Sequence, residues 1–337
     1  MATPDAALLL EDASVRFGEA AGIEDLSMSI PAGALVGLIG PSGAGKTTTV
    51  RLLTGGLAPT GGVVRVLGED PRRFRRETRS QIGYMPQHFS LYPDLTTREN
   101  VDFMASLFGM LWPARRRRVP EALRTVDLWD VRKRRASRLS GGMQRRLQLA
   151  ATLVHDPAVL FLDEPTAGLD PLLRATIWSE LRRLRDAGGT LLVTTQYVGE
   201  AEECDLVAMV AEGRLVALDT PDALRASVAG GEQVELRTTQ PIGDADRAAL
   251  PSVRAVAMRG PTRMRVTVES AAAAIPALVE ALGDRGIDVV EASERRPSFD
   301  EVFAALVERA REPQEDGGPN VVTSDHEDPE GSATEAA

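Results

Sequence analysis

The sequence predicts an α/β protein built on a parallel β-sheet and followed by a small second α/β domain. Short apolar runs at 35–39, 158–162 and 190–195 have the length and composition of buried strands. Stretches with helical periodicity separate these runs, and alternation of strands with helices favours a parallel sheet covered by helices. Beyond residue 220 the pattern changes to alternating strands and two helices, which indicates the second domain.

Composition narrows the class of protein. The 337 residues carry a net charge of −10, 43% of them are hydrophobic, and the length favours two domains. The single cysteine, Cys204, excludes an intrachain disulfide framework and a cysteine-based zinc site, and it fits a reducing compartment. No apolar run approaches the roughly 18–20 residues of a membrane span, and the first residues lack the features of a secretory signal. We therefore expect a soluble intracellular protein.

The elements follow in order along the chain. Residues 7–70 read as strands joined by Gly-rich turns, with a helix that ends at Gly55 and Gly56. Residues 94–150 have helical periodicity, and an amphipathic helix is expected near 171–186. The second domain is expected to hold strands near 234–239 and 264–270 and helices at 272–284 and 298–310. Ser298 and Glu301 form a capping-box pattern at the start of the last helix.

The last 26 residues account for most of the net charge. Residues 312–337 hold eight acidic residues and no Lys or Arg, so residues 1–311 have a balance of only −2. Such a polar, acidic segment buries too little apolar surface to order itself, and we expect it to be a disordered tail. The expected organisation is a first domain at 7–222, a small α/β domain at 223–311 and an acidic tail at 312–337.

A glycine-rich segment between the 35–39 strand and the following helix matches the P-loop pattern. Backbone N–H groups of such a loop surround phosphates, and the helix N-terminus adds a favourable dipole. Lys46 would contact the β- and γ-phosphates, and the Thr47 hydroxyl would ligate Mg²⁺. The expected nucleotide-binding residues are Gly40, Pro41, Ser42, Gly43, Ala44, Gly45, Lys46, Thr47 and Thr48.

Two carboxylates end the apolar run at 158–162. Asp163 is placed to hold Mg²⁺, and Glu164 is placed to polarise an attacking water as a general base. In isolation such a pair often caps a turn, but downstream of a P-loop it predicts hydrolysis of a nucleoside triphosphate.

The segment Leu139–Gln144, LSGGMQ, resembles the LSGGQ signature of ABC-type ATPases, with Met143 before the glutamine. Its Ser140, Gly141, Gly142 and Gln144 would form a second anion-binding helix N-terminus. Other motifs are similar to those of the family and occur in the same order across residues 7 to about 222. They are the Q-loop glutamine Gln87, the D-loop aspartate Asp170 and the adenine-stacking aromatic Phe17. An aromatic near a strand end is also often a core residue.

The resemblance implies a fold with a RecA-like core, an antiparallel β subdomain and a helical subdomain. It also implies ATP and Mg²⁺ as ligands, with Gln87, Thr47 and Asp163 near the metal. Two nucleotide-binding subunits of this family meet head to tail, so a homodimer or a dimer with a second ATPase is expected. Asp170 would contact the opposite subunit, and Gln87 would link the site to a membrane partner.

One motif departs from the family pattern, because Gln196 stands where the switch histidine is usual. A glutamine amide can donate a hydrogen bond to a γ-phosphate oxygen but cannot become cationic or carry a proton. Thr194–Tyr197 and Arg296–Phe303 are similar to the daunorubicin/doxorubicin-resistance group of exporter ATPases, in which this glutamine is usual. That group implies a separate ABC-2-type integral-membrane permease, export of drug-like or amphipathic compounds, and a peripheral position at the cytoplasmic face of the membrane.

Three alternatives stay open on the sequence. The chain could be a soluble ABC-type ATPase acting on ribosomes or nucleic acid, a subunit for a lipid or polysaccharide exporter, or a regulatory module without turnover. Runs of Arg at 115–118 and 132–135 favour solvated helix faces over a nucleic-acid surface, because no aromatic interleaving or nucleic-acid module accompanies them. No nucleic-acid partner is therefore expected.

Overall fold

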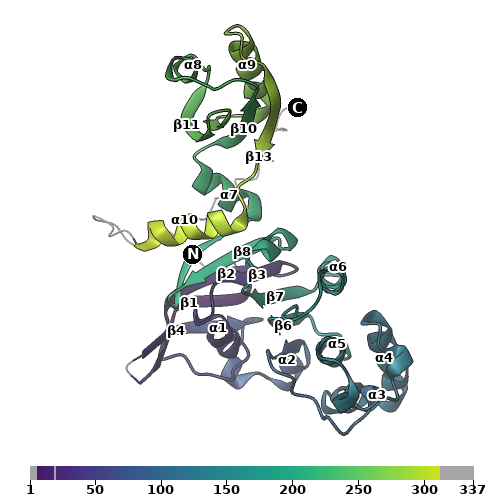
Figure 1. The fold of residues 1–337 in the computed structure, drawn as a ribbon. Helices are drawn as coiled ribbons and strands as arrows, with labels where there is room; N and C mark the ends of the chain where they lie inside the picture. The colour runs from purple at the N-terminus through teal and green to yellow at the C-terminus, as the bar shows by residue number, and fades with distance from the viewer. Residues whose placement is uncertain (1–5, 19, 312–337) are drawn as a thin grey trace, which may run out of the picture.

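The computed structural model describes residues 6–18 and 20–311, which form a larger body of two sheets and a smaller unit built on a third (Figure 1). The acidic segment expected to be disordered lies outside the described residues. Figure 1 shows the smaller unit standing apart from the body and joined to it through helices α7 and α10.

The central sheet of the body has six strands in the order β5-β6-β7-β3-β8-β9. Strands β5, β6, β7, β3 and β8 are parallel, and β9 is antiparallel to β8, which confirms the parallel sheet expected from the sequence. Every residue of β3, β6 and β7 is buried, which explains their continuous apolar runs. The strand bounds are β3 (Leu35–Ile39), β5 (Ile82–Met85), β6 (Val159–Asp163), β7 (Thr190–Thr195), β8 (Leu206–Ala211) and β9 (Arg214–Asp219).

A second, antiparallel sheet in the order β2-β1-β4 packs on the central sheet. It consists of β1 (Ala6–Phe17), β2 (Ala20–Pro31) and β4 (Gly61–Val66). Its buried side chains, such as Leu10, share one apolar cluster with Leu38 of β3 and Phe161 of β6. Leu52 of α1 (Lys46–Leu53) belongs to the same cluster, so the helix that follows the P-loop is anchored in this core.

Helices cover the other parts of the central sheet. Helices α3, α4 and α5 pack on one another, and α5 also contacts the edge strand β5. A reciprocal capping box between Thr96 and Glu99 starts α3. No helix within the described residues combines the length and the apolar character that a bilayer span requires. The bounds are α2 (Arg76–Ser80), α3 (Thr97–Leu107), α4 (Trp112–Thr125), α5 (Gly141–Leu153) and α6 (Pro171–Asp186), with short turns η1 (Pro71–Arg73), η2 (Trp129–Val131), η3 (Ala136–Arg138) and η4 (Val198–Glu203).

The smaller unit is a four-stranded antiparallel sheet in the order β11-β12-β10-β13 with its own apolar core. It follows α7 (Pro221–Ala229), and the chain then returns to the body as α10 (Phe299–Arg311). The unit comprises β10 (Glu232–Thr238), α8 (Asp244–Ala248), β11 (Val253–Gly260), β12 (Arg263–Val268), α9 (Ala271–Gly283) and β13 (Val289–Arg295).

Helix α10 packs against the body. Its buried Phe299, Val302 and Leu306 belong to the same apolar cluster as Leu224 of α7 and Ala201 of η4. Contacts with α7, η4 and β9 hold the helix in place. The division expected at residue 222 stays a prediction, and the structure adds that the end of the C-terminal segment shares the core of the body.

Candidate active site

The P-loop lies at the carboxyl end of β3 and opens into α1. Gly43 and Gly45 have φ angles of +82° and +101°, a region that side chains with a Cβ rarely adopt. A Cβ at Gly45 would also lie 2.7 Å from Cγ2 of Ile23, so glycine is required for space as well as for conformation. No side chain caps the first turn of α1, which leaves its N–H groups available to an anion.

Lys46 is buried in this loop. Its Nζ donates hydrogen bonds to the carbonyl oxygens of Gly40, at 2.7 Å, and Pro41, at 3.0 Å. Burial lowers the pKa of Lys46, and the carboxylates of Glu164 and Asp163 act in the opposite direction. The ammonium group is therefore held by two loop carbonyls within the electrostatic influence of both carboxylates.

Asp163 is the last residue of β6, and its carboxylate accepts hydrogen bonds from two hydroxyl groups. Its Oδ1 accepts hydrogen bonds from Thr194, at 2.6 Å, and from Thr47, at 3.3 Å. Its Oδ2 is buried and has no hydrogen-bond partner among the described residues. The strand register explains the contact between Asp163 and Thr194, because the two residues pair across the parallel strands β6 and β7. From the sequence Thr194 was noted only as part of the Thr194–Tyr197 match, not as a site residue.

Glu164 is brought against Gln87, which lies 77 residues away in the sequence. Gln87 Nε2 donates to Glu164 Oε2 at 2.9 Å, and the backbone N–H of Glu164 donates to Thr194 Oγ1 at 2.9 Å. The φ angle of Glu164 is +51°, a left-handed conformation that is uncommon for a residue with a side chain. These contacts orient the carboxylate and leave its other oxygen, Oε1, without a bond to Gln87.

Arg145 is a site residue that the sequence reading missed. It lies on α5, is buried, and donates hydrogen bonds to the carbonyl oxygens of Gln87, at 2.5 Å, and Asp163, at 2.6 Å. Further bonds reach the carbonyls of Pro86, Glu164 and Pro165. The one local signal for Arg145 in the sequence was a second polar residue, Gln148, on the same face of the helix. Gln148 is also buried, and it donates a hydrogen bond to the carbonyl of His88 at 2.8 Å.

Gln196 and Phe17 lie at the margin of this site. Gln196 is exposed and directly follows Thr195, which pairs with Ile39 of β3, so it emerges at the same sheet edge as the P-loop. The Phe17 side chain is 52% exposed at the end of β1, which does not fit the core role that such an aromatic often has. A Cβ at Gly22 would lie 2.6 Å from Cε2 of this ring, and the exposure of Phe17 leaves it able to stack on a planar base.

The signature residues are separated from the P-loop of the same chain. Ser140 caps α5 by accepting a hydrogen bond from the Met143 N–H at 3.3 Å, and Gly141 and Gly142 form the first turn. Gln144 donates instead to the Ala136 carbonyl at 3.1 Å. Helix α5 contacts the edge strand β5, whereas the P-loop follows β3 and opens into α1, and Figure 1 shows α5 and α1 at separate places on the body. The structure thus brings Lys46, Thr47, Gln87, Asp163 and Glu164 together and leaves the signature elsewhere.

Asp170 is likewise outside the cluster. It is exposed and caps α6 by accepting a hydrogen bond from the Leu173 N–H at 3.0 Å.

The residues present fit a nucleotide with a divalent cation. The uncapped helix N-terminus and Lys46 suit phosphates, while the buried and unpartnered Asp163 Oδ2 beside Thr47 Oγ1 suits Mg²⁺ or a water bound to it. Among the described residues no group of three or more His, Cys, Asp or Glu side chains gathers to hold a metal. Mg²⁺ often binds through one or two protein oxygens with phosphates and waters, and such a site needs no larger cluster.

Residues 23–167 match the model of a family described as ABC transporter. The chain is 37% identical to a daunorubicin resistance ATP-binding protein of Streptomyces coeruleorubidus, over 86% of this chain and 92% of that protein. It is 42% identical to a Nod factor export ATP-binding protein of Paraburkholderia xenovorans, over 77% of this chain and 85% of that protein.

Solved structures agree with the sequence relatives. A dimeric ATP-binding cassette in a post-hydrolysis state, bound to ADP and Pi, has a TM-score of 0.59 at 26% identity. The match covers 63% of this chain and 98% of that chain. The predicted P-loop α/β architecture with a further C-terminal α/β region is therefore confirmed.

Proposed function

Because this chain belongs to the ATP-binding proteins of ABC transporters, we propose that it powers a separate ABC-2-type membrane permease that exports drug-like or other amphipathic compounds. The chain is an ATPase whose hydrolysis is coupled to transport.

The P-loop and Asp163 hold the substrate in this proposal. Residues 40–48 surround the phosphates of ATP, with Lys46 at the β- and γ-phosphates and Phe17 stacked on the adenine. Thr47, Asp163 and the free amide oxygen of Gln87 are the groups that would hold Mg²⁺. When bound, Mg²⁺ neutralises charge on the phosphates. Thr194 keeps the Asp163 carboxylate in position through its 2.6 Å hydrogen bond.

Glu164 is proposed as the general base. The observation that carries this role is its hydrogen bond with Gln87, because one carboxylate oxygen is held while the other is left to accept a proton from water. Arg145 holds the backbone carbonyls of both residues, so the two loops cannot move independently. Gln196 donates to a γ-phosphate oxygen but carries no proton, and its contribution is smaller than that of Glu164.

A head-to-tail dimer completes each site in this proposal. The P-loop and the signature at Ser140 are both helix N-termini suited to anions, yet within one chain the signature opens α5, which contacts β5, and the P-loop follows β3. A second copy, or a second ATPase, supplies its signature to the nucleotide bound by this P-loop. The dimeric organisation of a similar cassette supports this assembly. The dimer would sit at the cytoplasmic face of the membrane as a peripheral subunit.

The assignment of the base is tested by phosphate release from purified protein. Glu164→Gln is expected to lower the rate about 10²–10⁴-fold while ATP still binds, because only the proton acceptor is lost. Gln196→Ala is expected to cause a smaller loss. Glu308→Gln makes the same chemical change at an exposed position on α10 and is the matched control. A wild-type rate in Glu164→Gln would exclude Glu164 as the base.

The transported compound is tested in cells. Coexpression with the permease should lower the accumulation of daunorubicin, and Glu164→Gln should abolish the effect. The 42% identity to a Nod factor export protein supports a second candidate, the export of a compound that is not a drug. Unchanged daunorubicin accumulation together with normal phosphate release would favour that second candidate.

A further inference from the structure

The switch residue Gln196 is followed by a short segment, η4, whose acidic side chains face two different helices. Glu200 is 5% exposed and pairs with Arg174 of α6, whose Nε lies 3.5 Å from Glu200 Oε1. Glu203 pairs with Arg182 of the same helix. Glu202 instead pairs with Arg225 of α7. The segment after Gln196 is thus held by α6 on one side and by the C-terminal part of the chain on the other.

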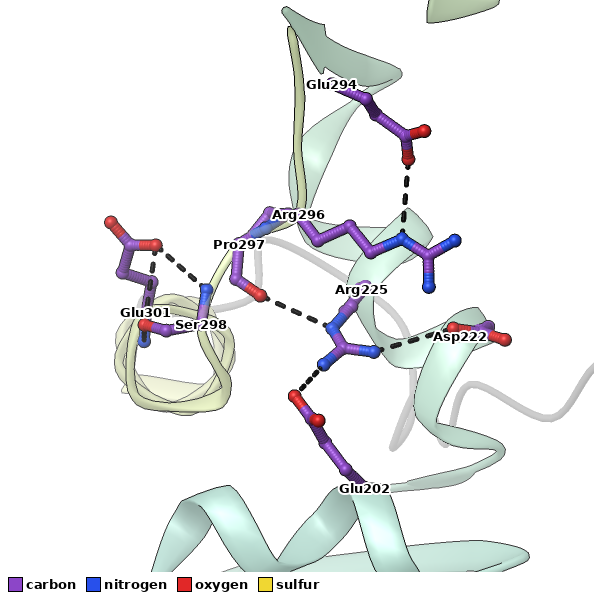
Figure 2. Close-up of polar contacts among 8 residues, drawn as sticks. All are labelled: Glu202, Asp222, Arg225, Glu294, Arg296, Pro297, Ser298 and Glu301. Carbon is purple, nitrogen blue, oxygen red and sulfur yellow. Dashed lines mark hydrogen bonds and ion pairs between the residues drawn. The ribbon is translucent and has the colours of Figure 1, made fainter. Parts of the chain in front are cut away.

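Arg225 joins three elements through one guanidinium group. The side chain is only 13% exposed, and one terminal nitrogen pairs with Glu202 of η4 (Figure 2). Its Nε donates to the carbonyl oxygen of Pro297 at 3.3 Å, and the guanidinium lies 4.3 Å from the centre of the Phe299 ring. Pro297 and Phe299 lie where the chain leaves the small unit and enters α10.

A capping box formed by Ser298 and Glu301 fixes the start of α10. Ser298 and Glu301 exchange capping hydrogen bonds, and Arg295 at the end of β13 also donates to Glu301 at 2.8 Å (Figure 2 shows the cap). Phe299 is buried in the body together with Ala201 of η4. A displacement of β13 would therefore pass through this cap to Arg225 and from there to η4.

We propose that Arg225 is a positioning residue that couples the C-terminal unit to the Gln196 switch, so that docking of α10 sets the rate of ATP hydrolysis. Arg225 touches no residue of the P-loop cluster described above, so the coupling acts on turnover and leaves ATP binding unchanged. The inference rests on the proposed role of Gln196.

The experiment uses the full chain and measures phosphate release against ATP concentration for Arg225→Ala, Glu202→Ala and the double variant. Glu202 is 61% exposed, so its removal opens no cavity, and the Arg225 guanidinium keeps the Pro297 carbonyl and Asp222 as partners. Asp222→Ala is the matched control. Asp222 contacts the same guanidinium at 3.5 Å but lies on α7 itself, so its loss does not cut the connection between elements.

Both single variants are expected to lower kcat by about 2–30-fold, the range typical of residues that modulate coupling, with KM for ATP unchanged. The double variant should be no slower than the slower single variant, because both remove one connection. Arg225→Lys should recover part of the rate, since it keeps the ion pair with Glu202 but loses the planar contact with Phe299. Asp222→Ala should behave as wild type.

The outcomes separate this inference from the proposed function. Wild-type kcat in Glu202→Ala and Arg225→Ala, with Glu164→Gln inactive, would overturn the coupling and leave the hydrolysis site intact. Equal changes of kcat in Asp222→Ala, or a rise in KM that accounts for the loss, would also overturn it. A wild-type rate in Glu164→Gln would instead exclude the proposed base and leave the coupling to be judged from the Arg225 and Glu202 variants. If Arg225→Ala fails to fold, Glu202→Ala alone decides the question.

Discussion

Replacing Arg145 with alanine is expected to lower the free energy of unfolding by about 3–5 kcal/mol and to abolish most of the phosphate release. Arg145 is buried and donates to five backbone carbonyls, of which those of Gln87 and Asp163 lie at charge-assisted distances of 2.5 and 2.6 Å. A hydrogen bond to a charged group contributes about 1.5–3 kcal/mol, and a buried carbonyl left without a donor costs about 1–3 kcal/mol.

Two or three of these five hydrogen bonds of Arg145 are strong, namely those to the carbonyls of Gln87, Asp163 and Glu164. The contacts with the Pro86 and Pro165 carbonyls, at 3.1 and 3.4 Å, are longer and weaker. Removing Arg145 also removes the cost of burying its charge, since burial lowers its pKa and the Asp163 and Glu164 carboxylates only partly oppose this. A loss of about 3–5 kcal/mol is a large share of the roughly 5–15 kcal/mol that stabilises a folded domain.

Urea titration followed by tryptophan fluorescence measures the stability, and phosphate release measures the site. Arg145→Lys is the informative companion, because its compact ammonium keeps the charge but cannot reach both loops with a planar fork. Arg183→Ala is the control. Arg183 is an exposed residue paired only with Glu180 in the part of the chain that the structure describes, and its loss should cost less than about 1 kcal/mol.

The reasoning would be refuted by a loss of stability below about 1 kcal/mol in Arg145→Ala with unchanged phosphate release. Full recovery of both quantities in Arg145→Lys would show that the charge matters and the fork does not.

Two further predictions concern the margins of the site and the fold. Phe17→Ala should weaken ATP binding by about 5–150-fold while Phe17→Tyr binds normally, because base stacking contributes about 1–3 kcal/mol. Titration with a fluorescent ATP analogue measures the affinity, and equal affinities of Phe17→Ala and the wild type would contradict stacking. Burial lowers the pKa of His155, opposed by its hydrogen bond to the Ile82 carbonyl and by Asp156. The unfolded chain therefore binds this proton more readily, so the contribution of His155 is complete above about pH 6.5 and is lost as the pH falls below that value. His155→Gln should flatten the fall in unfolding free energy between pH 7.5 and 5.5, and an unchanged slope would assign the pH dependence to other groups.

Much of the central fold could be predicted because its signals are local. A buried parallel strand is a short apolar run, and a P-loop needs its strand, glycines and helix within a few residues of one another. The helices near 171–186 and 298–310 were also predicted, since caps such as Ser298 with Glu301 act within one turn. Strands β11 and β13 were not predicted. Both strands lie at the edges of the small sheet, where buried and exposed side chains do not alternate regularly. The hydrophobic pattern of their sequences therefore shows little of the two-residue period of a strand.

Contacts between distant segments could not be predicted in this way. The bond between Gln87 and Glu164 and the bonds from Arg145 depend on which strands are neighbours and in what register. Arg145 looks like any other arginine of a helix rich in polar residues until the loops that it contacts are in place.

The sequence by itself determined the motifs, the class of chemistry and the order of the elements, because each of these is written in residues close together along the chain. Only the tertiary structure decided that Arg145 joins two loops, that the signature lies away from its own P-loop, and that α10 returns to the body beside the switch segment. The physical reason is that sheet register and the burial of polar groups depend on residues far apart in the chain, whose pairing no local pattern encodes.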